Sequence, residues 1–391
     1  MKNIRVGVVG IGNMGTAHAN CIFLGEIEGL MLTALCEINP QKTEYYKTVF
    51  LGVHFFSDYK EMIKSGEIDA IIIATPHYLH PVIAEYAFNH GLHVLTEKPA
   101  GVSVSNVKKM NEAAAESGKI FAIMFNQRTN YLFGELKKLV QGGKLGQIKR
   151  VSWSVTNWYR TQYYYDSGSW RATWAGEGGG VLLNQAPHNL DMLQWIFGLP
   201  RKIFADVTVG KYHNIEVEDE ANIFMKYDNG MFVTFLTSTG ETPGTNRLEV
   251  SGTLGKAVAE NGELKYWLGN IDEREFCFTT DKLSSHIDYT LHIIKDKPQS
   301  TAHKTILRNF AKAILNGEPL IAPGTDGINE LLISNAAYLS SWKEEWIDLK
   351  DFPYDEFEKR LNELKANSKV KPEEEYRASS GKYKNRWKVN W

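Results

Sequence analysis

The sequence is poor in cysteine, with only Cys21, Cys36 and Cys277 among 391 residues. No two of them form a CxxC pair, and a sparse, odd set is typical of a reducing compartment and not of a disulfide framework. The formal net charge is only -2, so the chain has no overall basic field that would favour nucleic acid as a partner. We therefore expect no disulfide scaffold, no metal site and no nucleic-acid partner.

Long hydrophobic runs are also missing. The N-terminal run Ile4–Gly10 is too short for a secretory signal, and no apolar stretch approaches the ~20 residues that a membrane span needs. Internal repeats and low-complexity tracts are absent from the sequence as well. We therefore expect no membrane partner and a cytoplasmic location.

The first third of the chain alternates short apolar runs with helical stretches, within a composition that is 43% hydrophobic and 23% charged. Such alternation predicts a parallel sheet covered by helices on both faces. The predicted strands are residues 4–9, 31–36, 69–74 and 92–96, and the predicted helices are residues 12–24, 40–50, 58–65 and 80–90.

The pattern changes after about residue 125. Residues 150–160 form a long strand-like stretch, and Tyr227-Asp-Asn-Gly within residues 220–239 is a hairpin signal. A further strand pair is predicted around 246–268, and helices near 302–316 and 327–343. We therefore predict an α/β Rossmann domain at 1–125, an α+β domain with a large open, mainly antiparallel sheet at 126–364, and a C-terminal tail or arm at 365–391.

A dinucleotide site is indicated by Gly10-Ile11-Gly12-Asn13-Met14-Gly15, a GxGxxG that follows a strand and opens a helix. The first glycine permits the turn, the second lets a pyrophosphate approach the backbone, and the third lets helix and strand pack closely. Glu37 lies 22 positions after Gly15, at the end of the second strand. Its carboxylate suits the ribose hydroxyls and repels a 2′-phosphate, so we expect NAD in preference to NADP.

Two later segments complete a recognisable set of motifs. Ala74-Thr75-Pro76-His77-Tyr78-Leu79-His80 is followed by Thr96-Glu97-Lys98-Pro99, and Gly178-Gly179-Gly180 precedes His188 and Asp191. Together with the glycine loop, these residues resemble the Gfo/Idh/MocA family, named for glucose–fructose oxidoreductase and inositol dehydrogenase. The resemblance implies a Rossmann domain followed by an open-sheet domain, through which members commonly oligomerise, so we expect a homo-oligomer, a dimer or a tetramer.

The same resemblance implies the roles of individual residues. Lys98 and His188 are the expected catalytic residues. Cofactor contacts are expected from Gly10, Gly12, Asn13, Met14, Gly15, Glu37, Thr75, Pro76, His80, Glu97 and Lys98.

The chemistry of alcohol oxidation fits the two catalytic candidates. An ammonium at a strand end, such as Lys98, stabilises charge on a reacting oxygen, and the alternative is a surface lysine in a turn. A histidine such as His188 suits proton acceptance near neutral pH, and the alternative is a histidine that caps buried backbone. Many family members carry aspartate where this chain has Asn184, which cannot take up a proton. Whether Lys98 or His188 is the general base therefore stays open.

Substrate-binding candidates lie after the first domain. Arg128 follows the domain boundary, and Asp191 shares a helix face with His188. Aromatic faces stack on sugar rings and arginine binds hydroxyls, although sheet core or subunit interface is an equal alternative for each residue. The full set of expected substrate contacts is Arg128, Tyr159, Arg160, Trp170, Arg171, Asn184, His188 and Asp191.

The expected activity is NAD-dependent oxidation of a secondary hydroxyl of a sugar or glycoside. The Asn-Gln-x-Pro-His form of residues 184–188 resembles a subgroup that acts on glucosides, which implies C3 of a glucoside as the reacting carbon. The alternatives are an inositol-type dehydrogenase, a glycoside hydrolase that retains NAD through transient oxidation, and a dinucleotide-sensing regulator without catalysis.

Overall fold

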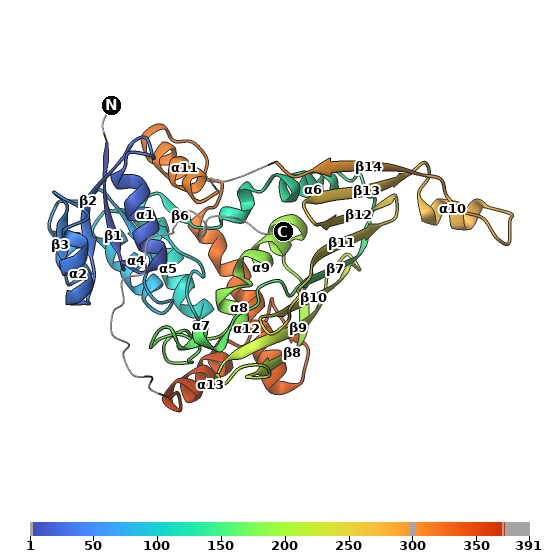
Figure 1. Cartoon of the computed structure of the whole chain (residues 1–391). Helices are drawn as coiled ribbons and strands as arrows, with labels where there is room; N and C mark the ends of the chain where they lie inside the picture. The colour runs from blue at the N-terminus through green and yellow to red at the C-terminus, as the bar shows by residue number, and fades with distance from the viewer. Residues whose placement is uncertain (1–2, 298–301, 370, 372–391) are drawn as a thin grey trace.

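The computed structural model describes residues 3–297, 302–369 and 371. Within these residues the chain forms two sheets with helices around and between them, as Figure 1 shows. None of the described helices combines the length and apolar character needed to cross a membrane.

The first sheet has six parallel strands in the order β3-β2-β1-β4-β5-β6. Its strands are β1 (Ile4–Val9), β2 (Leu30–Cys36), β3 (His54–Phe56), β4 (Ala70–Ile73), β5 (His93–Thr96) and β6 (Phe121–Ile123). The helices between them are α1 (Asn13–Phe23), α2 (Pro40–Lys47), α3 (Tyr59–Lys64), α4 (Leu79–Asn89) and α5 (Val104–Ser117). Every residue of β4 is buried, as expected for a strand covered on both faces. The predicted Rossmann fold is confirmed, although the helix predicted at 40–50 ends at Lys47, where the chain turns towards β3.

The second sheet has nine strands in the order β14-β13-β12-β11-β7-β10-β9-β8-β15. All neighbouring pairs are antiparallel except β7 and β10, which confirms the predicted mainly antiparallel sheet. Its strands are β7 (Ile148–Val155), β8 (Lys202–Val209), β9 (Glu218–Lys226), β10 (Phe232–Ser238), β11 (Asn246–Gly252), β12 (Gly255–Glu260), β13 (Glu263–Gly269), β14 (Tyr289–Lys295) and β15 (Ile347–Asp348).

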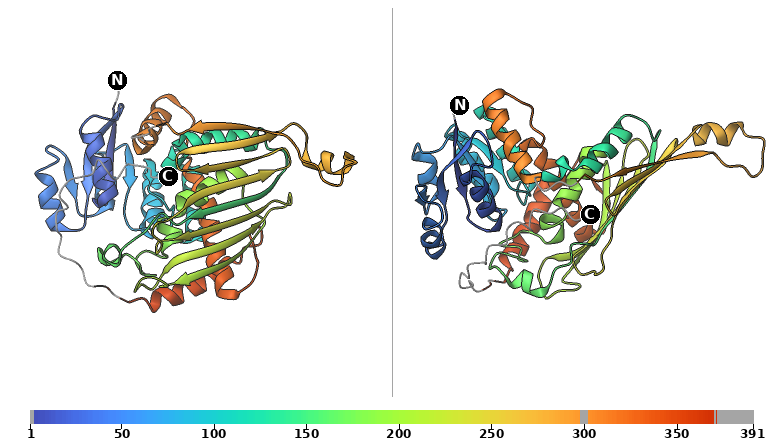
Figure 2. Two further views of the ribbon diagram at one scale, coloured as in Figure 1. Left: turned by 45° about the vertical axis from the view of Figure 1, so that its right-hand side comes forward. Right: turned by 45° about the horizontal axis from the view of Figure 1, so that its top comes forward.

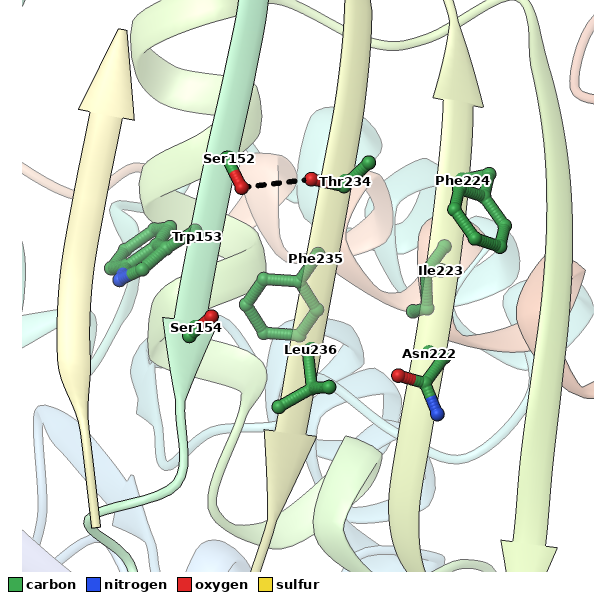
Figure 3. A pocket seen from close by; sticks show the side chains of 9 residues that line it. All are labelled: Ser152, Trp153, Ser154, Asn222, Ile223, Phe224, Thr234, Phe235 and Leu236. Carbon is green, nitrogen blue, oxygen red and sulfur yellow. Dashed lines mark hydrogen bonds between the residues drawn. The ribbon is translucent and has the colours of Figure 1, made fainter.

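Helices cover one face of this sheet and leave the other face bare, which is clearest in the right-hand view of Figure 2. The helical segments after the first domain are η1 (Asn126–Thr129), α6 (Tyr131–Gln141), α7 (Gln162–Asp166), α8 (Val181–Asn184), α9 (Pro187–Phe197), α10 (Glu273–Thr279), α11 (Ala302–Asn316), η2 (Gly324–Asp326), α12 (Gly327–Lys343) and α13 (Tyr354–Ala366). A shallow hollow on the sheet is lined by residues of β7, β9 and β10, and Figure 3 shows Ser152 of β7 bonded to Thr234 of β10 there.

Several predictions for this half are confirmed and others are corrected. The hairpin turns at Gly230, whose φ of 84° suits glycine, and α11 and α12 begin and end where predicted. The strand predicted at 150–160 ends at Val155, because the chain then enters the loop that leads to α7. The pair predicted around 246–268 is three strands, since a tight turn separates β11 from β12.

The chain crosses back to the first sheet late in the sequence. Lys304 of α11 forms an ion pair with Glu26 at 2.7 Å, and Pro323 forms a bridge with Ala122 of β6. The division at residue 125 stays a prediction, and α11 lies beside the first domain, against the loop that follows α1, as Figure 1 also shows. Most of the predicted tail lies outside the described residues, but Lys371 donates hydrogen bonds to the carbonyls of Tyr165 and Arg171.

Candidate active site

The glycine loop between β1 and α1 has the geometry of a phosphate cradle. Gly10 has a φ of 85°, and a Cβ on Gly15 would lie 1.8 Å from the carbonyl oxygen of Gly10. A Cβ on Gly12 would meet no atom within 4 Å, so the space above this glycine is open. Gly12 is the N-cap residue of α1, and no side chain caps this helix end. Of the next two residues, Asn13 is exposed and Met14 is half-buried. Free N–H groups and open space at a helix N-terminus fit the pyrophosphate of a dinucleotide.

Glu37 stands beside this loop at the end of β2. Its Oε2 accepts the N–H of Ile11 and its Oε1 accepts the N–H of Asn39, each at 3.0 Å. Each carboxylate oxygen keeps a further lone pair, so Glu37 can still accept the hydroxyl of a ribose. The arrangement fits the expected cofactor contact, which remains a prediction.

The loops after β4 and β5 are tied together by a buried histidine. The ring of His80 contacts the carbonyl oxygen of Pro99 at 2.7 Å through Nδ1 and that of Thr75 at 2.8 Å through Nε2. Burial lowers the pKa of His80, while the two carbonyl contacts oppose that shift. His80 therefore holds in place the two strand-end loops that carry Thr75, Pro76, Glu97 and Lys98.

Glu97 is anchored on the opposite side of the same loop. Its Oε1 lies 2.7 Å from Nε2 of His18 on α1, and its Oε2 accepts the N–H of Lys98 at 3.3 Å. Burial alone would raise the pKa of Glu97, but the His18 contact and the nearby Lys98 charge hold it at about 2. Glu97 is therefore a buried anion next to the expected catalytic lysine.

Lys98 reaches from the end of β5 to the second domain. Its Nζ donates a hydrogen bond of 2.7 Å to the carbonyl oxygen of Asn184, at the end of α8. Burial lowers the pKa of Lys98, and the carboxylates of Glu97, Glu330 and Glu177 oppose that shift. A lysine with a lowered pKa gives up and takes back a proton more readily near neutral pH.

His188 lies in the first turn of α9, and its Nδ1 is buried without a hydrogen-bond partner among the described residues. Burial lowers the pKa of His188 well below 6.5, and the nearby charges of Lys98 and His303 lower it further. The imidazole is therefore neutral at neutral pH, and it lies close enough to Lys98 to feel its charge. Lys98 is hydrogen-bonded to the carbonyl oxygen of Asn184, which precedes His188, so the fold holds these two residues, 90 positions apart in the sequence, in the same region.

A segment of the second domain closes over these loops. The ring of His77 lies 3.0 Å from the carbonyl oxygen of Glu177 through Nδ1, and the hydroxyl of Tyr78 donates to the carbonyl of Trp174 at 2.7 Å. Glu177 is itself buried, and its carboxylate accepts a hydrogen bond from the side-chain amide of Asn184. Sequence reasoning missed Glu177; its position directly before Gly178-Gly179-Gly180 was the one available signal.

The predicted aromatic and arginine residues divide into two groups. Arg171 stacks over Trp170, with its Cζ 4.5 Å from the ring centroid, and Trp170 lies edge-on to His77. Arg160 instead contacts Tyr164, and Tyr159 is 47% exposed. Tyr164 joins the two groups, because Arg171 also donates to its hydroxyl at 3.0 Å, so the loop that leads to α7 packs against the residues that reach the candidate site through His77.

Arg128 and Asp191 are bonded to each other. The guanidinium of Arg128 donates to both carboxylate oxygens of Asp191, at 2.9 and 2.6 Å, and to Asp326 at 2.7 Å. The side chains of Arg128 and Asp191 are 1% and 0% exposed. Both were expected to bind substrate, and this pairing instead gives them the geometry of a brace that fixes α9, the helix of His188. Within the described residues no group of three His, Cys, Asp or Glu side chains could hold a metal ion.

Comparison with known proteins places this architecture among characterised enzymes. The chain is 25% identical over 362 residues to myo-inositol 2-dehydrogenase of Thermotoga maritima, covering 89% of this chain and 99% of that one. It is 26% identical to levoglucosan dehydrogenase of Pseudarthrobacter phenanthrenivorans, with the same two coverages. Among solved structures, the WlbA dehydrogenase of Bordetella pertussis in complex with NADH and UDP-GlcNAcA superposes with a TM-score of 0.74, at 25% identity, over 89% of this chain and 99% of that one.

Family models match both halves of the molecule. Residues 4–125 match the oxidoreductase family model with an NAD-binding Rossmann fold, and residues 133–258 match the GFO/IDH/MocA C-terminal domain. The two matches occupy the six-stranded sheet and the greater part of the nine-stranded sheet. The open cradle above Gly12 is consistent with the cofactor that the first model describes. The chain belongs to the Gfo/Idh/MocA family of NAD-binding oxidoreductases.

Proposed function

We propose that this protein oxidises a secondary hydroxyl of a sugar or glycoside, with Lys98 and His188 both in contact with the reacting hydroxyl. The observation that carries the proposal is the hydrogen bond from Lys98, which follows β5, to the carbonyl oxygen of Asn184, which precedes His188, at the edge of the sheet that also holds the glycine cradle. In parallel sheets, ligands bind outside this edge. NAD, when bound, supplies the hydride acceptor.

The electrostatics support a division of work between the two residues. Lys98 lies among Glu97, Glu177 and Glu330, and its charged form stabilises negative charge as the hydroxyl loses its proton. His188 is neutral and only half-buried, although its Nδ1 is buried without a partner among the described residues, and we propose that the accessible edge of its ring meets the substrate hydroxyl. Because the lowered pKa makes His188 a weak base, Lys98 is the better acceptor: as the neutral amine it takes the hydroxyl proton, and the ammonium formed in that step supplies the stabilising charge.

The substrate class follows from the surroundings of the site. Trp170 with Arg171 stacked over it offers an apolar face for a sugar ring and a guanidinium for its hydroxyls. We propose C3 of a glucoside as the reacting position. An inositol is the second candidate, because a full-length relative is named as a myo-inositol 2-dehydrogenase.

The deciding experiment measures NADH formation over a panel of glucosides, free sugars and inositols. Lys98→Ala should lower turnover by ~10²–10³ through loss of charge stabilisation, and His188→Ala by ~10²–10⁴. NAD binding should survive in both variants, and Lys109→Ala on the exposed face of α5 is the matched control. Full turnover in both site variants, or no oxidation of any member of the panel, would reject the proposal.

We also propose that the protein is a cytoplasmic homo-oligomer, a dimer or a tetramer. The bare face of the nine-stranded sheet supports this, because Phe224 of β9 is 39% exposed there beside the hollow of Figure 3. Light scattering at micromolar concentration tests it, and a monomeric mass would contradict it.

A further inference from the structure

Glu177 makes two contacts that join separate parts of the candidate site. One carboxylate oxygen accepts the side-chain amide of Asn184, and the other accepts the backbone N–H of Ala172 at 2.5 Å. Glu177 is only 2% exposed. A buried carboxylate with a donor on each oxygen is held in one orientation, and it holds its donors in turn.

The contact with Asn184 fixes which way that amide faces. A carboxylate only accepts hydrogen bonds, so the amide nitrogen of Asn184 must lie towards Glu177. The carbonyl oxygen Oδ1 of the same side chain is then turned away from Glu177, and it accepts no hydrogen bond from any described residue. Asn184 is half-buried, and its backbone carbonyl accepts from Lys98. An oriented acceptor is therefore left open next to the proposed catalytic lysine.

The contact with Ala172 ties Glu177 to the loop that contains Trp170 and Arg171. Ala172 has a φ of 53°, a left-handed conformation that is unfavourable in a residue with a Cβ. The hydrogen bond from its N–H to Glu177 helps to hold this conformation, directly after Trp170 and Arg171. Glu177 thus links the loop with the stacked ring to the amide of Asn184.

The charges around Glu177 favour its ionised form against burial. Burial raises the pKa of Glu177, while Arg171, the N–H of Ala172, the amide of Asn184 and Lys98 all lower it. Burial prevails, so the pKa of Glu177 lies above its ordinary value, and the charges of Arg171 and Lys98 are among the effects that limit this rise.

We propose that Glu177 is a positioning residue that turns Oδ1 of Asn184 towards the substrate, where it accepts a hydrogen bond from a hydroxyl neighbouring the one that is oxidised. The favoured substrates are then vicinal diols of a ring, and analogues without the neighbouring hydroxyl are rejected. The substrate part of this inference rests on the proposed function, whereas the orientation of Asn184 does not.

The test is a double-mutant cycle. In Glu177→Gln, the new carbonyl oxygen still accepts from Ala172, so its amide nitrogen faces Asn184 and forces that amide to turn round. An N–H group then points at the substrate, and kcat/KM for a vicinal diol should fall about 10- to 100-fold, as expected for a mismatched polar contact. In Asn184→Asp, two carboxylates meet, and both the melting temperature and kcat/KM should fall.

The double variant, which combines Glu177→Gln with Asn184→Asp, should have a higher kcat/KM and a higher melting temperature than either single variant. The amide nitrogen introduced at position 177 donates to one oxygen of the carboxylate introduced at position 184, and the other oxygen of that carboxylate again accepts from the substrate. We expect kcat/KM to return to within about threefold of the unmodified protein, since the lost hydrogen bonds are restored. A purely structural role of Glu177 would restore the melting temperature of the double variant without restoring kcat/KM, and either that result or additive losses in both would overturn the inference.

Glu218 supplies the matched control. It is also fully buried, and it accepts hydrogen bonds from the N–H groups of Gly180 and Leu182 and from Tyr338, but it does not contact Asn184. Glu218→Gln should lower the melting temperature, and combining it with Asn184→Asp should give additive changes.

Two readouts separate failure of this inference from failure of the proposed function. Melting temperatures need no substrate, so their compensation in the Glu177→Gln, Asn184→Asp pair tests the orientation of the amide even if no sugar is oxidised. If sugars are oxidised, a deoxy analogue that lacks the neighbouring hydroxyl should lose about 10- to 100-fold with the unmodified protein and under about threefold with Glu177→Gln. Equal losses with both proteins, or additive melting temperatures, would reject it.

Discussion

The two halves of the candidate site are built in different ways. In the first domain, the glycine loop and Glu37 belong to one β-α-β unit, and the backbone itself forms the cradle. Where the two domains meet, the side chains of the site are buried or half-buried and depend on partners far away in the sequence, such as Lys98 on Asn184 and Arg128 on Asp191. A site made of backbone can be recognised from spacing, because glycine is required by local geometry. A site made of buried side chains cannot be recognised from spacing, because the packing of distant segments determines which side chains bond to each other.

Removing the brace under His188 should produce the largest effect. Arg128→Ala leaves the carboxylate of Asp191 buried without its cation, and the free energy of unfolding should fall by about 3–5 kcal/mol. Urea unfolding measures this change. Lys47→Ala, which removes an exposed ion pair with Glu44, is the control and should cost no more than about 1 kcal/mol. If both variants unfold at the same urea concentration, Arg128 does not stabilise α9, and the prediction that it binds substrate is favoured instead.

A change in the glycine cradle should have a smaller effect on stability and a selective effect on the cofactor. In Gly15→Ala the Cβ meets the carbonyl oxygen of Gly10, so the loop must shift, at a cost of about 1–3 kcal/mol. Affinity for NAD, measured by calorimetry, should fall with it. Gly12→Ala sharpens the comparison, because its Cβ meets nothing within 4 Å. That variant should keep its melting temperature while its Cβ obstructs the pyrophosphate, and unchanged affinity for NAD in both variants would place the cofactor elsewhere.

The choice between NAD and NADP should depend on Glu37 and give the smallest change. Glu37→Ser removes the charge that repels a 2′-phosphate, and the ratio of kcat/KM for the two cofactors should shift by about tenfold, the equivalent of roughly 1.4 kcal/mol. Steady-state kinetics with each cofactor measures this. Equal efficiency of the unmodified protein with both cofactors would show that Glu37 does not discriminate.

Much of the fold could be predicted because periodicity and turn residues act locally. The bounds of α11 and α12 and the hairpin at Gly230 follow from apolar spacing and from one residue with positive φ. The prediction of a long strand at 150–160 was wrong after Val155, because the β-branched and aromatic residues there belong to a loop packed against other elements. α13 was not predicted at all; its charged sequence buries only Phe357 and Leu361.

The sequence by itself determined the class of the molecule and its cofactor cradle, since glycines at fixed spacing after a strand leave the backbone few alternatives. It also singled out Lys98 and His188, through motifs and not through any sign that the two meet. Only the tertiary structure decided that Glu177 faces Asn184 and that Arg128 is bound to Asp191. Hydrogen bonds between buried polar groups are set by which segments pack together, and no spacing along the chain contains that information.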